Sequence, residues 1–216
     1  MLLIAGDLTR AGDAAEARVL AEELRDLPVP VLAVLGNHDY HRGQEAAVTQ
    51  ALEMVGISVL EGTGRVLEVG GVRVGVAGVK GFGGGFAGAC ATEFGEPEMK
   101  AFVHHTRVAA GSLEATLRGL DSELRIALLH YSPVPDTLVG ERPEIHAFLG
   151  SYLLGEAADR AGADLVLHGH AHGGTEKGQT KGGVPVRNVA QSVIRRAYAL
   201  YTLELKPARA KEAAAS

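Results

Sequence analysis

Four short apolar runs in this 216-residue chain each end abruptly in residues that can bind a metal ion. Short apolar runs bounded by turn residues are typical of strands buried on both faces of a sheet. Loops beyond the strand ends of such sheets are where binding sites gather, so we expect these polar residues to meet at one sheet edge. The four junctions are Leu2–Ala5 before Gly6-Asp7, Val31–Leu35 before Gly36-Asn37-His38-Asp39, Ile126–Leu129 before His130, and Leu165–Leu167 before His168-Gly169-His170-Ala171-His172.

The remaining elements follow from periodicity and from helix and turn signals. Arg65–Val69 and Val72–Val79 are predicted strands of a hairpin turned by Gly70-Gly71, and the glycine-rich segment 80–86 is predicted to be a loop. The predicted helices are Ala14–Leu27 (capped by Asp13), Gln44–Val55, Pro97–Leu120 and Ser151–Ala161, and two more strands are predicted at Val184–Val189 and Ala197–Leu203.

A β-α-β opening followed by hairpins predicts a mixed α/β fold, with two packed mixed sheets and helices outside them. No internal repeat or linker interrupts the pattern, so residues 1–205 are expected to form one domain. Residues 206–216 are polar and alanine-rich and are expected to form a C-terminal tail.

Composition limits the class of protein. Hydrophobic residues make up 46% of the chain, but no apolar run reaches the length of a membrane span, which predicts a soluble domain with a substantial core. The N-terminal residues lack the basic start of a secretory signal. A single cysteine, Cys90, fits a reducing cytoplasm, and we expect it to be buried.

Charge argues against one group of partners. The net charge is −5 and no long basic run occurs, so a dedicated nucleic-acid surface is not expected. A nucleotide as a small substrate is compatible with this charge. The sequence does not indicate the oligomeric state.

The polar residues at the strand ends form a mixed oxygen and nitrogen donor set without thiolates, which suits Mn²⁺, Fe²⁺ or Zn²⁺. A carboxylate can bridge two cations, so Asp7 is the natural shared ligand. Gly36 and Gly169 are expected to let the backbone turn sharply just before the ligands. The candidate metal ligands are Asp7, Asn37, His130, His170 and His172.

Each motif alone has an ordinary structural interpretation. Gly6-Asp7-Leu8-Thr9 is a common turn with a helix cap, and His130 alone is more often a hydrogen-bonded core or surface residue. His170 and His172 project to the same side if their segment is extended, whereas a tight loop would direct them to different ions. The four motifs together, in this order, favour a metal site.

Together the motifs resemble those of the calcineurin-like metallophosphoesterases. The pattern of that family is Asp-x-His, then Gly-Asp, Gly-Asn-His-Asp/Glu, a later His, and Gly-His-x-His. The resemblance extends from Asp7 to His172 and implies a four-layer α/β/β/α sandwich with two divalent metal ions. It also implies hydrolysis of a small phosphomonoester or phosphodiester by metal-activated water.

The resemblance implies a role for each matched residue. Asp7 would bridge the two metals, and Asn37, His130 and His170 would complete the ligands of one of them. His172 would bind the other metal. His38 would stabilise the transition state or protonate the leaving oxygen, with its imidazole held by Asp39. The glycine-rich loop 80–86 is a candidate wall on the substrate side.

The chain departs from the family pattern at its beginning, because the six residues before Asp7 contain no Asp-x-His motif. One explanation is that the sequence starts late and lacks a first strand. A second is a protein that binds one metal tightly and hydrolyses weakly, with histidines elsewhere compensating. A third is a scaffold or binding protein that keeps the fold without catalysis. The other histidines are His41, His104, His105, His146 and His168.

Overall fold

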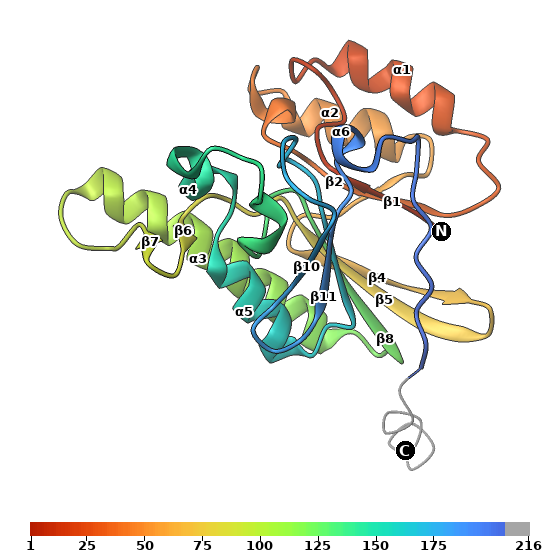
Figure 1. Ribbon diagram of the computed structural model, residues 1–216. Coiled ribbons are helices and arrows are strands. Elements are labelled where there is room, and N and C mark those ends of the chain that lie inside the picture. The colour runs from red at the N-terminus through yellow and green to blue at the C-terminus, as the bar shows by residue number, and fades with distance from the viewer. Residues whose placement is uncertain (206–216) are drawn as a thin grey trace.

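A computed structural model of the chain describes residues 1–205, and Figure 1 shows its strands lying between two pairs of helices. The smaller sheet has the order β1-β2-β3, and its strands are all parallel. It comprises β1 (Leu2–Ala5), β2 (Val31–Val34) and β3 (Ser58–Val59). This sheet was expected to be mixed; it is parallel because each of its connections crosses over through a helix.

The larger sheet has six strands in the order β10-β11-β9-β8-β5-β4 and is mixed. The hairpin of β4 and β5 and the pair β10–β11 are antiparallel, while β5, β8, β9 and β11 run parallel to one another. Its strands are β4 (Thr63–Val69), β5 (Val72–Val79), β8 (Leu124–Leu129), β9 (Leu165–His168), β10 (Lys177–Gln179) and β11 (Pro185–Asn188).

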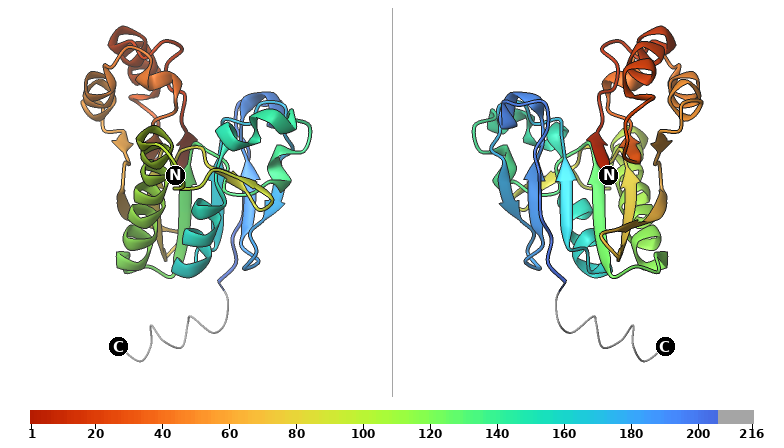
Figure 2. Two further views of the ribbon diagram at one scale, coloured as in Figure 1. Left: turned by 90° about the vertical axis from the view of Figure 1, so that its left-hand side faces the viewer. Right: turned by 90° about the vertical axis from the view of Figure 1, so that its right-hand side faces the viewer.

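Three apolar clusters separate four layers. Helices α1 (Ala14–Leu24) and α2 (Glu45–Glu53) cover the small sheet through a cluster that includes Ala17 and Leu52. A second cluster fills the space between the sheets. The third lies under α3 (Pro97–Gly119) and α5 (Tyr152–Ala161), which lie in front of the large sheet in the left view of Figure 2. The α/β/β/α sandwich is therefore confirmed.

Strand β8 shows how the sequence produces these layers. Ile126 and Leu128 point into the cluster between the sheets, whereas Ala127 and Leu129 point into the cluster under the helices. Side chains alternate between the two faces of a strand, and both faces of β8 are covered. An uninterrupted apolar run is what such a strand requires.

One predicted strand is wrong. Residues 197–203 form no regular element, although Tyr201 and Leu203 pack partly buried against the cluster between the sheets and Leu200 is exposed. The side chains alternate as in a half-buried strand, but no strand within residues 1–205 pairs with this segment. Alternation reports burial, whereas a strand also needs a partner for its backbone groups.

Several smaller features also differ from expectation. The loop 80–86 contains β6 (Gly85–Phe86), which pairs with β7 (Ala89–Cys90). Helix α1 ends at Leu24 rather than at Leu27, and Cys90 is exposed rather than buried. Sequence reasoning missed β3, β10 and the short helices α4 (His146–Leu149) and α6 (Gln191–Ile194). The expected tail, 206–216, lies outside the described residues.

The carboxyl ends of the parallel strands in both sheets meet at one edge of the molecule. The imidazole of His130, just after β8, hydrogen-bonds to the carbonyl of Ala5 at the end of β1, which ties the two sheets together. Among residues 1–205, no helix has both the length and the apolar character needed to cross a membrane.

Candidate metal centre

Four strand ends bring four of the predicted ligands together. Asp7 follows β1, Asn37 follows β2, His130 follows β8 and His170 follows β9. Ligand atoms of Asp7, His130 and His170 all lie within 4.8 Å of one another. The Asn37 Oδ1 is 2.8 Å from the Nε2 of His130, which adds it to the cluster.

The hydrogen bonds of His130 show that these residues fit a cation. The Nδ1 of His130 lies 2.8 Å from the Ala5 carbonyl, which can only accept, so Nδ1 carries the proton. Burial lowers the pKa of His130 to about 4, so the ring is neutral at pH 7 and Nε2 holds a lone pair. That lone pair faces oxygens of Asn37, at 2.8 Å, and Asp7, at 3.3 Å. Three electron-pair donors converge with no hydrogen between them, an arrangement that a divalent cation satisfies.

His170 is oriented in a similar way. Its Nε2 donates to the carbonyl of Phe148 at 3.3 Å, which leaves Nδ1 as the free electron-pair donor. Burial lowers the pKa of His170 to about 4, so this ring is also neutral at pH 7. The ring lies 4.7 Å from that of His130 and 4.4 Å from that of Tyr131, centroid to centroid. The neutral form of histidine is the one that binds metals.

Two of the four candidate ligands that converge have a left-handed backbone. Asp7 has φ 54° and His170 has φ 65°, whereas residues other than glycine rarely have positive φ. Such conformations cost free energy and persist where the surrounding structure holds them. Their occurrence at two ligand positions supports a functional reason for the geometry.

Glycines beside the ligands provide space. A Cβ added to Gly36 would lie 2.1 Å from the Oδ1 of Asp7, and one added to Gly169 would lie 2.8 Å from the Ala5 carbonyl oxygen. Neither of these two glycines has the left-handed φ of a sharp turn, so the expected reason for them was wrong. Gly6 has φ 87°, and a Cβ there would also lie 2.4 Å from the Nδ1 of His130.

Asp39 has a different set of contacts from the one implied by the resemblance. It is fully buried, and its carboxylate accepts hydrogen bonds from the backbone of Leu8, Thr9 and Gly36 and from the Thr9 hydroxyl. The imidazole of His38 instead donates from Nδ1 to the carbonyl of Arg10 at 2.9 Å. Asp39 therefore ties the loop after β1 to the loop after β2, and it does not hold the ring of His38.

The remaining predicted ligand, His172, is exposed and lies outside the cluster of Asp7, His130 and His170. The ring of His41 lies 4.7 Å from that of His38, on the exposed side of the turn. His168 is a core residue: it is fully buried and contacts the Gly169 carbonyl through Nδ1 and the Thr137 hydroxyl through Nε2.

Sequence reasoning assigned the loop 80–86 to a substrate wall without identifying its first residue as a separate feature. Lys80 is buried at the carboxyl end of β5, and its ammonium lies 5.0–5.3 Å from the ring centroids of Tyr40, Phe82 and Tyr131. The sequence did contain a signal that could have singled out Lys80: it comes directly after a predicted strand, as the candidate metal ligands do.

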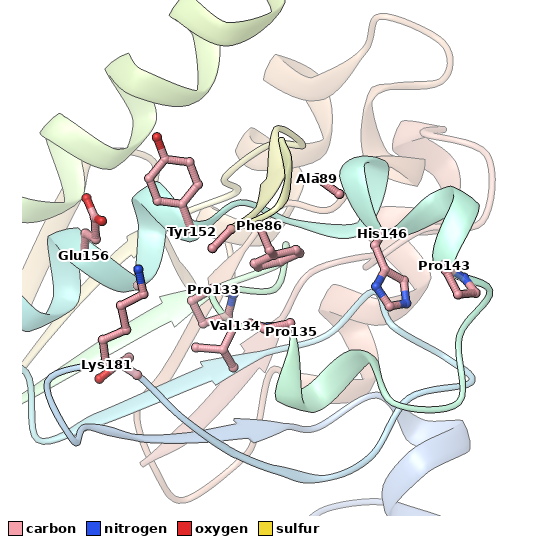
Figure 3. Close-up of a pocket in the computed structure, with 13 residues that line it drawn as sticks. Phe86, Ala89, Pro133, Val134, Pro135, Pro143, His146, Tyr152, Glu156 and Lys181 are labelled. Carbon is pink, nitrogen blue, oxygen red and sulfur yellow. The ribbon is translucent and has the colours of Figure 1, made fainter. Parts of the chain in front are cut away.

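A separate cavity of about 270 Å³ lies away from these residues (Figure 3). Phe86 and the segment 133–135 form its apolar centre, with Glu156 and Lys181 at one end and His146 at the other. None of the candidate metal ligands lines it. The cluster of candidate ligands at the strand ends and this apolar cavity are therefore separate features of the molecule.

An Asp, an Asn and two neutral His side chains gather at the carboxyl ends of parallel strands, which makes this an α/β protein with a candidate metal-binding cluster. The family model for calcineurin-like phosphoesterases matches residues 1–174, and the chain belongs to this family.

Solved structures of the same fold are similar over most of the chain. One is the phosphopantetheinyl hydrolase PptH of Mycobacterium tuberculosis, with a TM-score of 0.68 and 17% identity, covering 90% of this chain and 79% of that one. Another is TT1561 of Thermus thermophilus, with a TM-score of 0.51 and 19% identity, covering 87% and 75%. No curated protein matched the sequence. At these identities the structures support the fold.

Proposed function

We propose that this protein is a metal-dependent phosphoesterase that hydrolyses a small phosphomonoester or phosphodiester. The observation that carries the proposal is the convergence of the lone pair of His130 with oxygens of Asp7 and Asn37. The family to which the chain belongs supports the same chemistry. The single cysteine is consistent with the cytoplasm as its location.

Asp7, Asn37, His130 and His170 would hold one divalent cation, and His172 is the candidate ligand for a second. When bound, such cations supply positive charge that stabilises phosphoryl oxygens and lowers the pKa of bound water. In this assignment Asp7 would be the ligand shared by both cations. Its Oδ1 also accepts a hydrogen bond from the backbone N–H of His38 at 3.1 Å, so ligand and catalytic residue are positioned together.

His38 would serve the leaving group. Its Nδ1 donates to the Arg10 carbonyl, so the ring presents Nε2, which transfers a proton or donates to a phosphoryl oxygen when the imidazole is protonated. His38 is half-buried, so part of the residue is accessible to substrate. Asp39 contributes by fixing the two loops that carry Asp7 and His38.

Hydrolysis of p-nitrophenyl phosphate and bis(p-nitrophenyl) phosphate in the presence of Mn²⁺ tests the proposal. The parent protein should hydrolyse at least one ester and retain metal after gel filtration. Asn37→Ala should lose both, because it removes a ligand. His38→Ala should keep the metal and lose roughly 10²–10⁴-fold in kcat, the range for general acid–base groups.

The alternative is a protein of this fold that binds metal or a partner without hydrolysis. Metal bound in the parent with no turnover of either ester would favour that alternative. Absence of both metal and turnover would remove the enzymatic proposal altogether.

A further inference from the structure

Lys80 lies beside the candidate metal centre although it is not one of its ligands. It directly follows β5, the neighbour of β8, and its carbonyl accepts hydrogen bonds from the backbone N–H groups of His130 and Tyr131. A cation at this position is therefore adjacent to the strand end that carries His130.

The surroundings of the Lys80 ammonium are mostly aromatic. The residue is 8% exposed, and its Nζ lies 5.0 Å from the ring centroids of Tyr40 and Phe82 and 5.3 Å from that of Tyr131. These are cation–π distances, which stabilise a charge without neutralising it. Three rings on three different segments thus hold one ammonium in place.

The hydrogen-bonding capacity of this ammonium is largely unused by the protein. An ammonium has three N–H donors, and the Nζ of Lys80 makes one long hydrogen bond of 3.3 Å to the Gly81 carbonyl. Within residues 1–205 no carboxylate comes within ion-pair distance of its Nζ; the carboxylate of Glu61 bonds to the backbone N–H of Lys80 and attracts the ammonium electrostatically from farther away. Burial of a charge whose N–H donors are largely unused is costly, and a bound anion that accepts hydrogen bonds from them would reduce that cost.

Two of the three rings connect Lys80 to segments that carry candidate site residues. The ring of Tyr131 lies 4.4 Å from that of His170, so the same ring contacts both a candidate ligand and the ammonium of Lys80. Tyr40 belongs to the same turn as His38, η1 (His38–Tyr40). The group of Lys80, Tyr40, Phe82 and Tyr131, here called the lysine cage, therefore lies beside the turn that carries His38, the residue proposed above to serve the leaving group.

We propose that the lysine cage is a second anion-binding position and that the substrate is a phosphate ester whose leaving group carries another anionic group, a carboxylate or a phosphate. The inference rests on the proposed phosphoesterase function, because the metal centre would hold the scissile phosphate. The ammonium of Lys80 would then act as a positioning and specificity-determining group, which donates hydrogen bonds to the second anion.

Binding of non-hydrolysable phosphonates tests this proposal. Phosphonoacetate, 3-phosphonopropionate and 4-phosphonobutyrate are each compared with their carboxamides by calorimetry in the presence of Mn²⁺. The parent should bind the carboxylate about tenfold more tightly than the carboxamide for at least one chain length. The bisphosphonates of the same lengths test phosphate as the second anion.

The variant Lys80→Met, which keeps an apolar chain of similar length, should lose that preference while binding the carboxamides as the parent does. Lys177→Met is the matched control, because Lys177 is exposed on β10 and carries the same charge. A merely structural role of Lys80 would weaken carboxylate and carboxamide alike. Chelation of Mn²⁺ in solution is the same for every variant, so the comparison isolates the side chain.

Two results would overturn the inference: a parent that shows no preference for a second anion at any length, or a Lys80→Met variant that retains the preference. Hydrolysis of p-nitrophenyl esters by such proteins would leave the proposed function intact. Conversely, a Lys80-dependent preference without hydrolysis of any ester would remove the proposed function and keep the anion-binding position.

Discussion

At the scale of single residues, the candidate metal centre depends on atoms that approach more closely than side chains normally allow. The backbone of Gly36 lies against the carboxylate of Asp7, and the backbone of Gly6 lies against the ring of His130. The left-handed backbone of Asp7 directs its carboxylate toward these neighbours. Small changes here should therefore affect metal binding before they affect the fold.

Gly36→Ala tests this close approach. The added Cβ would lie 2.1 Å from the Oδ1 of Asp7, so either the carboxylate or the loop must move. We expect the affinity for Mn²⁺, measured by calorimetry, to fall about tenfold or more, as it does when groups that orient ligands are lost. Gly119→Ala, where a Cβ meets nothing within 4 Å, should bind Mn²⁺ as the parent does. Unchanged affinity in Gly36→Ala would show that Asp7 is not a ligand.

Burial of His168 predicts a dependence of stability on pH. Burial lowers its pKa to about 3, below the value of about 6.5 expected in the unfolded chain. Between these values the unfolded state binds the proton and the folded state does not, so stability falls as pH falls, by about 1.4 kcal/mol per pH unit for this residue.

His168→Gln should reduce this dependence, because Gln can donate to the Gly169 carbonyl and accept from Thr137 without titrating. Urea unfolding of metal-free protein at pH 6.0 and 5.0 measures the difference. We expect the parent to lose roughly 1 kcal/mol more than the variant over this interval. Equal losses would show that His168 titrates normally.

At the scale of elements, helix ends and strand ends place the functional residues. Helix α5 is capped at its start by Ser151, whose hydroxyl accepts from the backbone N–H of Leu153, and at its end by Gly162, which has a left-handed conformation. That sharp end returns the chain directly to β9, which carries His170 at its far end. The register of β9, and with it the position of His170, is then fixed by its pairing with β8 and β11.

Two glycine substitutions in and beside helices test how the backbone conformation of a glycine affects stability. Gly162→Ala should lower the free energy of unfolding by about 1–2 kcal/mol, because a Cβ is disfavoured at φ 66°. Gly111→Ala, in α3 with nothing within 4 Å, should raise it by about 0.5–1 kcal/mol. Urea unfolding at pH 7 measures both. A neutral or stabilising effect of Gly162→Ala would contradict the left-handed assignment.

At the scale of the whole molecule, the two sheets are joined at the edge where the site lies. His130 from the large sheet bonds to Ala5 of the small sheet, and its other nitrogen faces Asp7 and Asn37 of the small sheet. A cation held by residues of both sheets would therefore stabilise the packing of one sheet against the other. Binding only to the folded state raises stability by mass action.

Thermal unfolding with and without metal measures this coupling. Mn²⁺ at about 100 times its Kd should stabilise the parent by about 2.7 kcal/mol, seen as a rise in Tm over the protein treated with a chelator. Asn37→Ala should show little of this rise. An identical rise in that variant would place the metal elsewhere in the chain.

Much of the fold followed from local patterns. The apolar runs predicted β1, β2, β8 and β9, and the Gly70-Gly71 turn predicted the β4–β5 hairpin, because a buried strand and a tight turn each leave a signature in a few neighbouring residues. The segment 197–203 carried the same signature and formed no strand, since backbone pairing depends on a neighbour that local sequence does not specify.

By itself the sequence determined the family, the order of the layers and the types of residue that could bind a metal. The spacing of buried residues and the chemistry of ligand side chains can both be read from short segments. Tertiary structure alone decided three further features. It showed that Asp39 ties two loops rather than orienting His38, that Gly36 supplies space rather than a turn, and that Lys80 lies in an aromatic cage beside His130. These features depend on contacts between strands that are distant in the chain, and distances of that kind are set only when both sheets pack together.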